Sequence, residues 1–253
     1  MIQALIWDVD GTIAETERDG HLVAFNHAFE AMGLPWRWDD AEYGELLKIA
    51  GGRERLVYDL ERRTDIPPAG PEREALTSEV HSRKNAAYAE IVAQGRIAAR
   101  PGVLRLVDEC SSAGVAMAVA TTTSRANVAA LFRSLWGPSW QQRFPVVVGA
   151  EDAPVKKPDP LVYMLALQRL GIPAAQAFAL EDSPNGLHAA LAAGLRCGVT
   201  RGMYFTGADF GGAAWVRDNL DAVAPDTPLM TLALLDAAGS GSIRSSPSAR
   251  EIS

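Results

Sequence analysis

Two closely spaced aspartates are the first residues in this chain whose types and spacing could carry out chemistry. Asp8 and Asp10 follow the apolar, strand-like residues 2–6 almost directly, with one valine between the two carboxylates. Burying two like charges this close together costs several kcal/mol or more unless a partner offsets them. A divalent cation is the obvious partner, so the pair predicts a metal site whose other ligands come from elsewhere in the chain.

Three further apolar runs are followed by polar residues that could complete such a site. Each run is short and bounded by Gly, Pro or polar residues, which is typical of strands buried on both faces. Ligands of an open parallel sheet bind at the carboxyl ends of its strands, so we expect these polar residues to share one rim. They are Thr121 after residues 115–120, Lys157 after residues 144–150, and Glu181 with Asp182 at the end of residues 177–181.

The carboxylates of this set suit Mg²⁺, which prefers oxygen ligands and takes one or two carboxylates together with substrate oxygens. Asp8 and Asp182 could supply those carboxylates, and Asp10 could contribute its backbone carbonyl. Glu181 could be a further ligand or could orient the site from behind. The residue types leave both roles of Glu181 open.

The same residues could transfer a phosphoryl group. Asp8 could attack phosphorus and form an aspartyl phosphate, while Asp10 could protonate the leaving alkoxide and later activate water. Lys157 and Thr121 would hold the phosphoryl oxygens, on which charge has to be stabilised. Thr122 is a second candidate for this role, because the chain has three consecutive threonines at this point.

The elements that must position these residues alternate between strands and helices. Helical patterns occupy residues 102–114 and 159–172, and a third begins at Ser183; they separate the apolar runs, the last of which is residues 195–200. Strands that alternate with single helices predict an α/β fold with a doubly wound, Rossmann-like parallel sheet.

Residues 15–98 interrupt this alternation and predict a separate helical unit. They contain four helical stretches and no convincing strand, which places an all-helical cap domain within a core made of residues 1–14 and 99–237. Residues 238–253 are small and polar, and we expect a disordered tail there. The four helical stretches are residues 22–32, 40–49, 53–62 and 72–94.

Composition excludes several classes of function. The net charge of −7 argues against nucleic acid or an anionic membrane as the main partner. Cys110 and Cys197 are too few and too far apart for a disulfide scaffold or a zinc motif. The chain shows neither a secretion signal nor a long apolar span, so we expect a cytoplasmic monomer that acts on a small molecule.

The rim residues resemble the four signature motifs of the haloacid dehalogenase-like (HAD) phosphatase superfamily. The match consists of the DVDGT segment of residues 8–12, Thr121, Lys157 before Pro158, and the LEDS segment of residues 180–183. The motifs occur in the family's order, and the helical insertion matches its cap. The resemblance implies a Mg²⁺-dependent hydrolase in which Asp8 is the nucleophile and Asp10 is the acid and base.

The cap is similar to that of the CbbY-type phosphatases, which accompany the Calvin cycle and dephosphorylate xylulose 1,5-bisphosphate, an inhibitory by-product of Rubisco. This similarity lies in the ETERDGH segment of residues 15–21 and the YGELLKIAGGRER segment of residues 43–55. It implies that Glu17 and His21 face the sugar and that Arg53 binds the distal phosphate. An arginine fork is well suited to that role, because it can bind phosphate through two hydrogen bonds. Lys48 and Arg55 are expected to be surface charges.

Other functions stay open at this point. A β-phosphoglucomutase-like enzyme shares the core motifs, a similar cap and the need for a distal phosphate site. A phosphoglycolate phosphatase would share the core chemistry, although its substrate is too small to need that site. A binding protein without catalysis is a third possibility, which the complete set of motifs disfavours.

Overall fold

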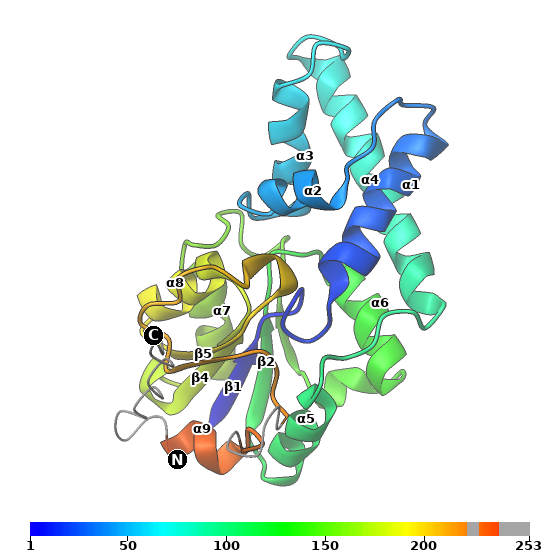
Figure 1. The fold of residues 1–253 in the computed structure, drawn as a ribbon. Coiled ribbons are helices and arrows are strands. Elements are labelled where there is room, and N and C mark those ends of the chain that lie inside the picture. The colour runs from blue at the N-terminus through cyan, green and yellow to red at the C-terminus, as the bar shows by residue number, and fades with distance from the viewer. Residues whose placement is uncertain (222–227, 238–253) are drawn as a thin grey trace, which may run out of the picture.

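The computed structural model describes residues 1–221 and 228–237 and contains a six-stranded parallel sheet. The predicted α/β fold is therefore confirmed (Figure 1). Strand β6 was not predicted, because its three half-buried residues at the sheet edge form no apolar run. The sheet has the order β3-β2-β1-β4-β5-β6, with β1 (Ala4–Trp7), β2 (Ala116–Ala120), β3 (Val146–Val148), β4 (Ala177–Glu181), β5 (Arg196–Thr200) and β6 (Trp215–Arg217).

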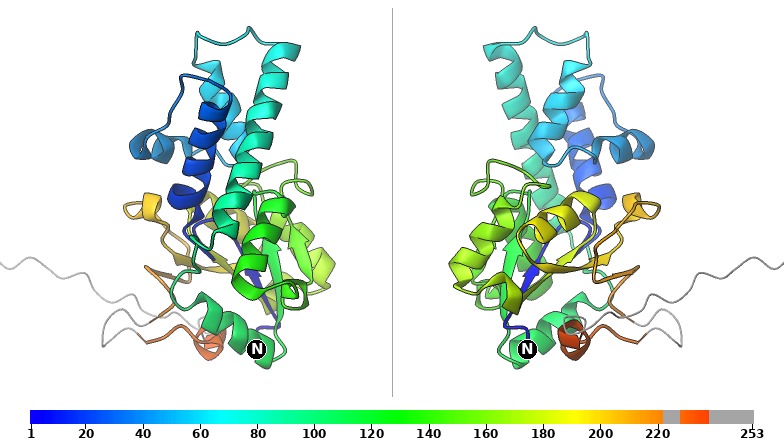
Figure 2. Two further views of the ribbon diagram at one scale, coloured as in Figure 1. Left: turned by 90° about the vertical axis from the view of Figure 1, so that its right-hand side faces the viewer. Right: turned by 90° about the vertical axis from the view of Figure 1, so that its left-hand side faces the viewer.

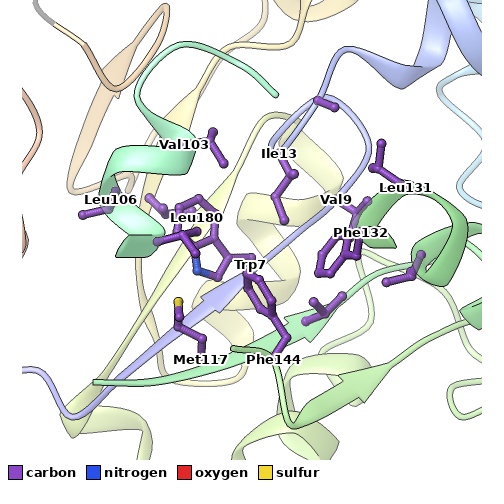
Figure 3. Packing of buried hydrophobic residues seen from close by; sticks show 14 of the residues in the cluster. Trp7, Val9, Ile13, Val103, Leu106, Met117, Leu131, Phe132, Phe144 and Leu180 are labelled. Carbon is purple, nitrogen blue, oxygen red and sulfur yellow. The ribbon is translucent and has the colours of Figure 1, made fainter. Parts of the chain in front are cut away.

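Helices cover both faces of the sheet, because alternate residues of each strand point to opposite faces. In β1, Leu5 and Trp7 belong to one apolar cluster and Ala4 and Ile6 to the other. Figure 3 shows the first cluster around Trp7, with side chains from both strands and helices. The first cluster includes residues of α5 (Val103–Ser112), α6 (Arg125–Trp136) and α9 (Leu232–Ala237), and the second includes residues of α7 (Leu161–Leu170) and α8 (Pro184–Ala192).

The inserted segment is helical and lies beyond the carboxyl ends of the strands (Figures 1 and 2). Residues 15–98, all of them described, contain no β-strand. Phe25, Phe29, Trp38, Tyr43 and Leu56 form much of a third apolar cluster within this segment. Its helices are the π-helical η1 (Glu17–Leu22), followed by α1 (Val23–Ala31), α2 (Asp40–Leu46), α3 (Gly52–Glu61) and α4 (Pro71–Ala93).

The two connections between this helical segment and the sheet run side by side. Ala14 and Ala99 form an isolated antiparallel bridge, and the Arg100 amide donates to the carbonyl of Ile13 over 2.8 Å. The expected boundaries of the insertion, 14/15 and 98/99, adjoin this crossing and stay a prediction. The expected tail of residues 238–253 lies outside the described residues.

Short 3₁₀ turns complete the fold: η2 (Trp140–Gln142), η3 (Ala174–Gln176) and η4 (Met203–Phe205). Within the described part of the chain, no helix has the length and apolar character needed to cross a membrane.

Candidate active site

A cavity of about 190 Å³ lies between the helical cap and the carboxyl ends of the strands. Residues from both parts of the chain line it, so a molecule bound there contacts the strand-end carboxylates and the cap together. The core contributes Asp8, Asp10, Thr122, Lys157, Asp182, Ser183, Pro184, Asn185 and Phe205, and the cap contributes Glu17, Leu47, Lys48, Ala50, Gly51 and Arg55.

Asp8, Lys157 and Glu181 form a buried chain of charges. The Lys157 ammonium donates to Asp8 Oδ1 and to Glu181 Oε1 over 2.6 Å each, and to the Ala120 carbonyl over 3.0 Å. The other oxygen of Asp8 accepts a 3.0 Å bond from the hydroxyl of Thr12. Burial raises the pKa of Asp8 to about 7, although the adjacent Lys157 lowers it. Lys157 is therefore the cation that stabilises ionised Asp8 and that would face an incoming anion.

Glu181 is completely buried, and both of its carboxylate oxygens accept hydrogen bonds. Oε1 accepts from Lys157 and, over 2.6 Å, from the hydroxyl of Tyr163, while Oε2 accepts from the Asp182 amide over 3.2 Å. Gly186 leaves room for this carboxylate, because a Cβ there would overlap it. This environment suits a residue that holds Lys157 in place.

Asp8, Glu181 and Asp182 could hold a metal ion, because one carboxylate oxygen from each lies within 4.8 Å of the others. Burial raises the pKa of Asp182 well above its ordinary value, and the charges of Asp8 and Glu181 raise it further. A Cβ at Gly11 or at Gly202 would overlap the Asp182 carboxylate, so both glycines are needed to bring backbone this close. Crowded carboxylates with too little positive charge among them fit a hard divalent cation.

Asp10 is oriented by two residues at the start of the cap. Its Oδ1 accepts a 2.6 Å bond from the hydroxyl of Thr16 and lies 3.0 Å from His21 Nε2. Burial alone would raise the pKa of Asp10, but His21, Thr16 and the nearby Lys84 outweigh it and lower the pKa to about 2. Asp10 is thus held as a carboxylate at the edge of the cavity.

His21 does not line the cavity. Its ring is buried and stacks on Tyr88 with the centroids 4.3 Å apart, and its Nδ1 has no hydrogen-bond partner among the described residues. His21 therefore contacts Asp10 and not the cavity in this conformation, and its expected contact with the sugar stays a prediction.

The predicted threonines and lysines separate into different environments. Thr122 lines the cavity, whereas Thr121 is buried and its hydroxyl accepts a 3.2 Å bond from the amide of Thr123. Lys156 donates instead to the carbonyls of Ala150 and Ala153. Of the two adjacent lysines, Lys157 is the one that reaches the carboxylates.

On the cap side, Tyr43 connects Glu17 to Arg55. The buried hydroxyl of Tyr43 donates to Glu17 Oε2 over 2.6 Å and accepts from Arg55 over 2.9 Å. Arg55 also approaches Glu17 to 3.7 Å and is only 5% exposed. The expectation that Arg55 is a surface charge is therefore wrong: its stem packs inside the cap and it lines the cavity. Arg55 lies two positions after Arg53 in the same helix, and the sequence contains no feature that shows which of the two arginines faces the cavity.

Arg53 takes a different direction. It lies in the first turn of α3, is 41% exposed along its side chain and pairs with Glu74 of α4. It is not among the residues that line the cavity, whereas Gly51 and the exposed Lys48 are.

Lys84 is a further cation near the site that sequence reasoning missed. It is 3% exposed and forms no hydrogen bond or ion pair with any residue of the described ranges, although its ammonium lies 5.2 Å from the Phe25 ring centroid. Burial lowers the pKa of Lys84 to about 8, against the opposing charges of Asp10 and Glu17. A buried lysine without a partner is costly, so Lys84 fits a site that receives an anion.

Comparison with known proteins agrees with this geometry. The model of the haloacid dehalogenase-like hydrolase family matches residues 5–200. Protein CbbY of Cereibacter sphaeroides is 43% identical over 219 residues, which are 87% of this chain and 93% of CbbY.

Two crystal structures of CbbY from Rhodobacter sphaeroides have the same fold. The complex with phosphate has a TM-score of 0.84 at 42% identity and covers 93% of this chain and 100% of that one. A mutant in complex with xylulose 1,5-bisphosphate has a TM-score of 0.80 at 43% identity and covers 87% and 95%. The chain therefore belongs to the haloacid dehalogenase-like hydrolase family.

Proposed function

We propose that this hydrolase is a Mg²⁺-dependent phosphatase that removes a phosphate from xylulose 1,5-bisphosphate through a phosphorylated Asp8. The observation that carries the proposal is the cavity itself, which has Asp8 beside Lys157 on one wall and Arg55 and Lys48 on the other. A bisphosphate needs cations at both ends. The similarity to a protein whose crystal structure holds xylulose 1,5-bisphosphate supports this choice.

Asp8 and Asp182 would hold the metal through their carboxylates, together with the backbone carbonyl of Asp10. When bound, Mg²⁺ would offset the carboxylate charges and polarise the phosphoryl group. Glu181 stays a candidate ligand, but its hydrogen bonds favour the role of holding Lys157. We therefore propose Glu181 as a positioning residue.

The protein's own residues would then divide the reaction into two steps. In the first step, Asp8 attacks phosphorus, the bond from phosphorus to the sugar oxygen breaks, and Asp10, which must carry a proton when this step begins, gives that proton to the oxygen. In the second step, Asp10 takes a proton from water, which attacks the phosphorylated Asp8 and releases phosphate. Lys157 and one or both of Thr121 and Thr122 would hold the phosphoryl oxygens throughout.

The second step starts from Asp10 as a carboxylate and leaves a proton on it, which Asp10 can give to the leaving oxygen of the next substrate. Thr16 and His21 hold Asp10 as a carboxylate, which is the form that accepts a proton from water. We propose that His21 contributes by orienting Asp10, and that Glu17 contacts the sugar from its place on the cavity wall.

The first experiment measures phosphate release with Mg²⁺ from four substrates: xylulose 1,5-bisphosphate, ribulose 1,5-bisphosphate, phosphoglycolate and β-glucose 1-phosphate. We expect the xylulose compound to have the highest kcat/KM. A preference for phosphoglycolate would contradict the argument from the cap. Conversion of β-glucose 1-phosphate to glucose 6-phosphate with little free phosphate would show a mutase instead.

The distal phosphate site has two arginine candidates, and the chain offers a matched pair of variants. We propose Arg55 as the main ligand, because it is buried at the cavity wall; Arg53, which the family resemblance favours, pairs with Glu74. Arg55→Met should lower kcat/KM for the bisphosphate about 100-fold, since a lost charge-assisted contact to phosphate costs about 1.5–3 kcal/mol.

The control for Arg55→Met is Arg53→Met, which should change the same constant less than about threefold. Both variants should hydrolyse a small ester such as p-nitrophenyl phosphate at rates close to wild type, and Arg55→Lys reports on whether charge alone suffices. The reverse order of the two losses would assign the distal phosphate to Arg53.

A cytoplasmic location, a monomeric state and a place beside the Calvin cycle stay predictions for this chain. They are compatible with its acidic composition and small-molecule cavity.

A further inference from the structure

The core segment Gly202–Phe205 lies between the carboxylates of the site and the cap. On the core side, the Gly202 amide donates to the Asp182 carbonyl over 3.1 Å, and Gly202 packs against the Asp182 carboxylate. The amide of Phe205 donates to the Gly202 carbonyl over 2.9 Å, which closes the segment into the turn η4. The position of this turn is therefore tied to that of a proposed metal ligand.

On the other side, the same turn contacts helix α2 of the cap. The hydroxyl of Tyr204 donates to Asp40 Oδ1 over 2.6 Å, at the first residue of α2. The Tyr204 ring meets the Tyr43 ring edge-on, with centroids 6.1 Å apart. Both views of Figure 2 show the gold turn at residues 203–205 directly below the blue helix α2.

Gly44 allows Tyr204 to pack closely on α2. A Cβ at Gly44 would lie 3.1 Å from Cδ1 of Tyr204, closer than an ordinary van der Waals contact. Glycine inside a helix costs about 1 kcal/mol relative to alanine. Gly44 therefore lowers the stability of α2 itself but permits close packing between α2 and the core.

Helix α2 also positions the cap wall of the cavity. Tyr43, one residue before Gly44, holds Glu17 and Arg55 through its hydroxyl. A second contact across the same boundary joins the Asn185 side chain to the Lys48 carbonyl over 3.3 Å. Movement of α2 away from the turn would disturb the hydrogen bonds through which Tyr43 holds Glu17 and Arg55 at the cavity wall.

We propose that Tyr204 is a positioning residue that holds the cap closed over the cavity, and that Gly202–Phe205 links the Asp182 side of the site to that closure. In this arrangement Tyr204 would contact neither Asp8 nor Asp10. It would act through α2 and Tyr43, which holds Glu17 and Arg55. The effect on bisphosphate turnover rests on the proposed function, whereas the effect on α2 itself does not.

The test compares Tyr204→Ala and Gly44→Val with wild type. Either change separates α2 from the turn, the first by removing the ring and the second by placing methyl groups against it. Each should lower kcat/KM for the bisphosphate about tenfold, mainly through KM, and leave p-nitrophenyl phosphate hydrolysis within about twofold. Tyr204→Phe, which keeps the ring and loses the bond to Asp40, should fall between wild type and Tyr204→Ala.

The double variant Gly44→Val/Tyr204→Ala distinguishes loss of the Gly44–Tyr204 contact, which we call the latch, from independent destabilisation of the fold by each substitution. If the two residues act through their contact, the double variant should lose no more than Tyr204→Ala alone. Losses that multiply to about 100-fold would overturn the proposal, as would equal losses on p-nitrophenyl phosphate.

Deuterium exchange tests the latch without any sugar substrate. With Mg²⁺ and inorganic phosphate, the amides of residues 40–46 should exchange faster in Tyr204→Ala than in wild type, while those of α5 in the core should not change. Unchanged exchange in α2 would overturn the latch. If the wild-type enzyme does not hydrolyse the bisphosphate but α2 still exchanges faster in Tyr204→Ala than in wild type, only the proposed function is contradicted.

Discussion

Asp8→Asn should reduce phosphate release at least about 10⁴-fold, which corresponds to about 5.5 kcal/mol of lost transition-state stabilisation. An amide is a poor nucleophile, and the change also removes one of the two carboxylates proposed to hold Mg²⁺. The local hydrogen bonds allow a folded variant, because the asparagine Oδ1 can still accept from Lys157 while its Nδ2 can donate to the hydroxyl oxygen of Thr12. The loss should therefore be in chemistry and metal binding.

The measurement is steady-state phosphate release, together with rapid acid quench of enzyme mixed with labelled substrate. Wild type should carry label on residue 8, and Asp8→Asn should carry none while keeping a cooperative thermal transition. Asp10→Asn is an informative companion, since it should slow both steps without removing the nucleophile. Hydrolysis by Asp8→Asn at a rate close to wild type would rule out a covalent mechanism through this residue.

The core of the fold could be predicted because its signals are local. Five strands are continuous apolar runs, and residues such as Asp8, Lys157 and Asp182 follow them at the sheet rim, where ligands of a parallel sheet bind. The same rule brings together residues far apart in sequence. The Lys157 ammonium contacts Asp8 although the two residues are 149 positions apart in the chain. Their spacing in the sequence alone gives no indication of this contact.

The cap wall could not be predicted in the same way. Helical patterns located its helices, but whether Arg53 or Arg55 faces the cavity depends on how α3 is rotated against α4, and charged residues set no apolar periodicity. Arg55 is buried because Tyr43 and Glu17 satisfy it. Those partners come from α2 and η1, so no window of sequence contains the whole group.

Lys84 shows a second reason for failure. On a helix of 23 residues with many polar side chains, a lysine reads as a solvated residue. Its burial follows from the packing of α4 against α1, where Phe25 lies over the ammonium. Only the tertiary arrangement shows that this cation is without a carboxylate partner in the described ranges and lies near Asp10 and Glu17.

Lys157→Met is the second substitution with a large expected effect, a loss of about 10³-fold in kcat/KM on bisphosphate and small ester alike. Lys157 contacts Asp8 and Glu181 and would face the transferred phosphoryl oxygens, so it acts on the group that every substrate shares. Removing one partner of a buried charge pair also leaves the others uncompensated, which costs about 3–5 kcal/mol of stability. The pKa of Asp8 should rise further in this variant, because the cation that lowers it is gone.

Lys156→Met is the matched control, since the adjacent lysine bonds only to two backbone carbonyls. It should keep kcat/KM within about threefold and unfold at nearly the wild-type temperature. A lower activity of Lys157→Met could come from lost catalysis or from lost stability. The double variant Lys157→Met/Glu181→Gln separates these two explanations. Replacing Glu181 by a neutral side chain should recover part of the thermal stability without recovering turnover, because the buried charge is removed but the cation at the phosphoryl group is still missing. Recovery of both together would mean that Lys157 serves the fold alone.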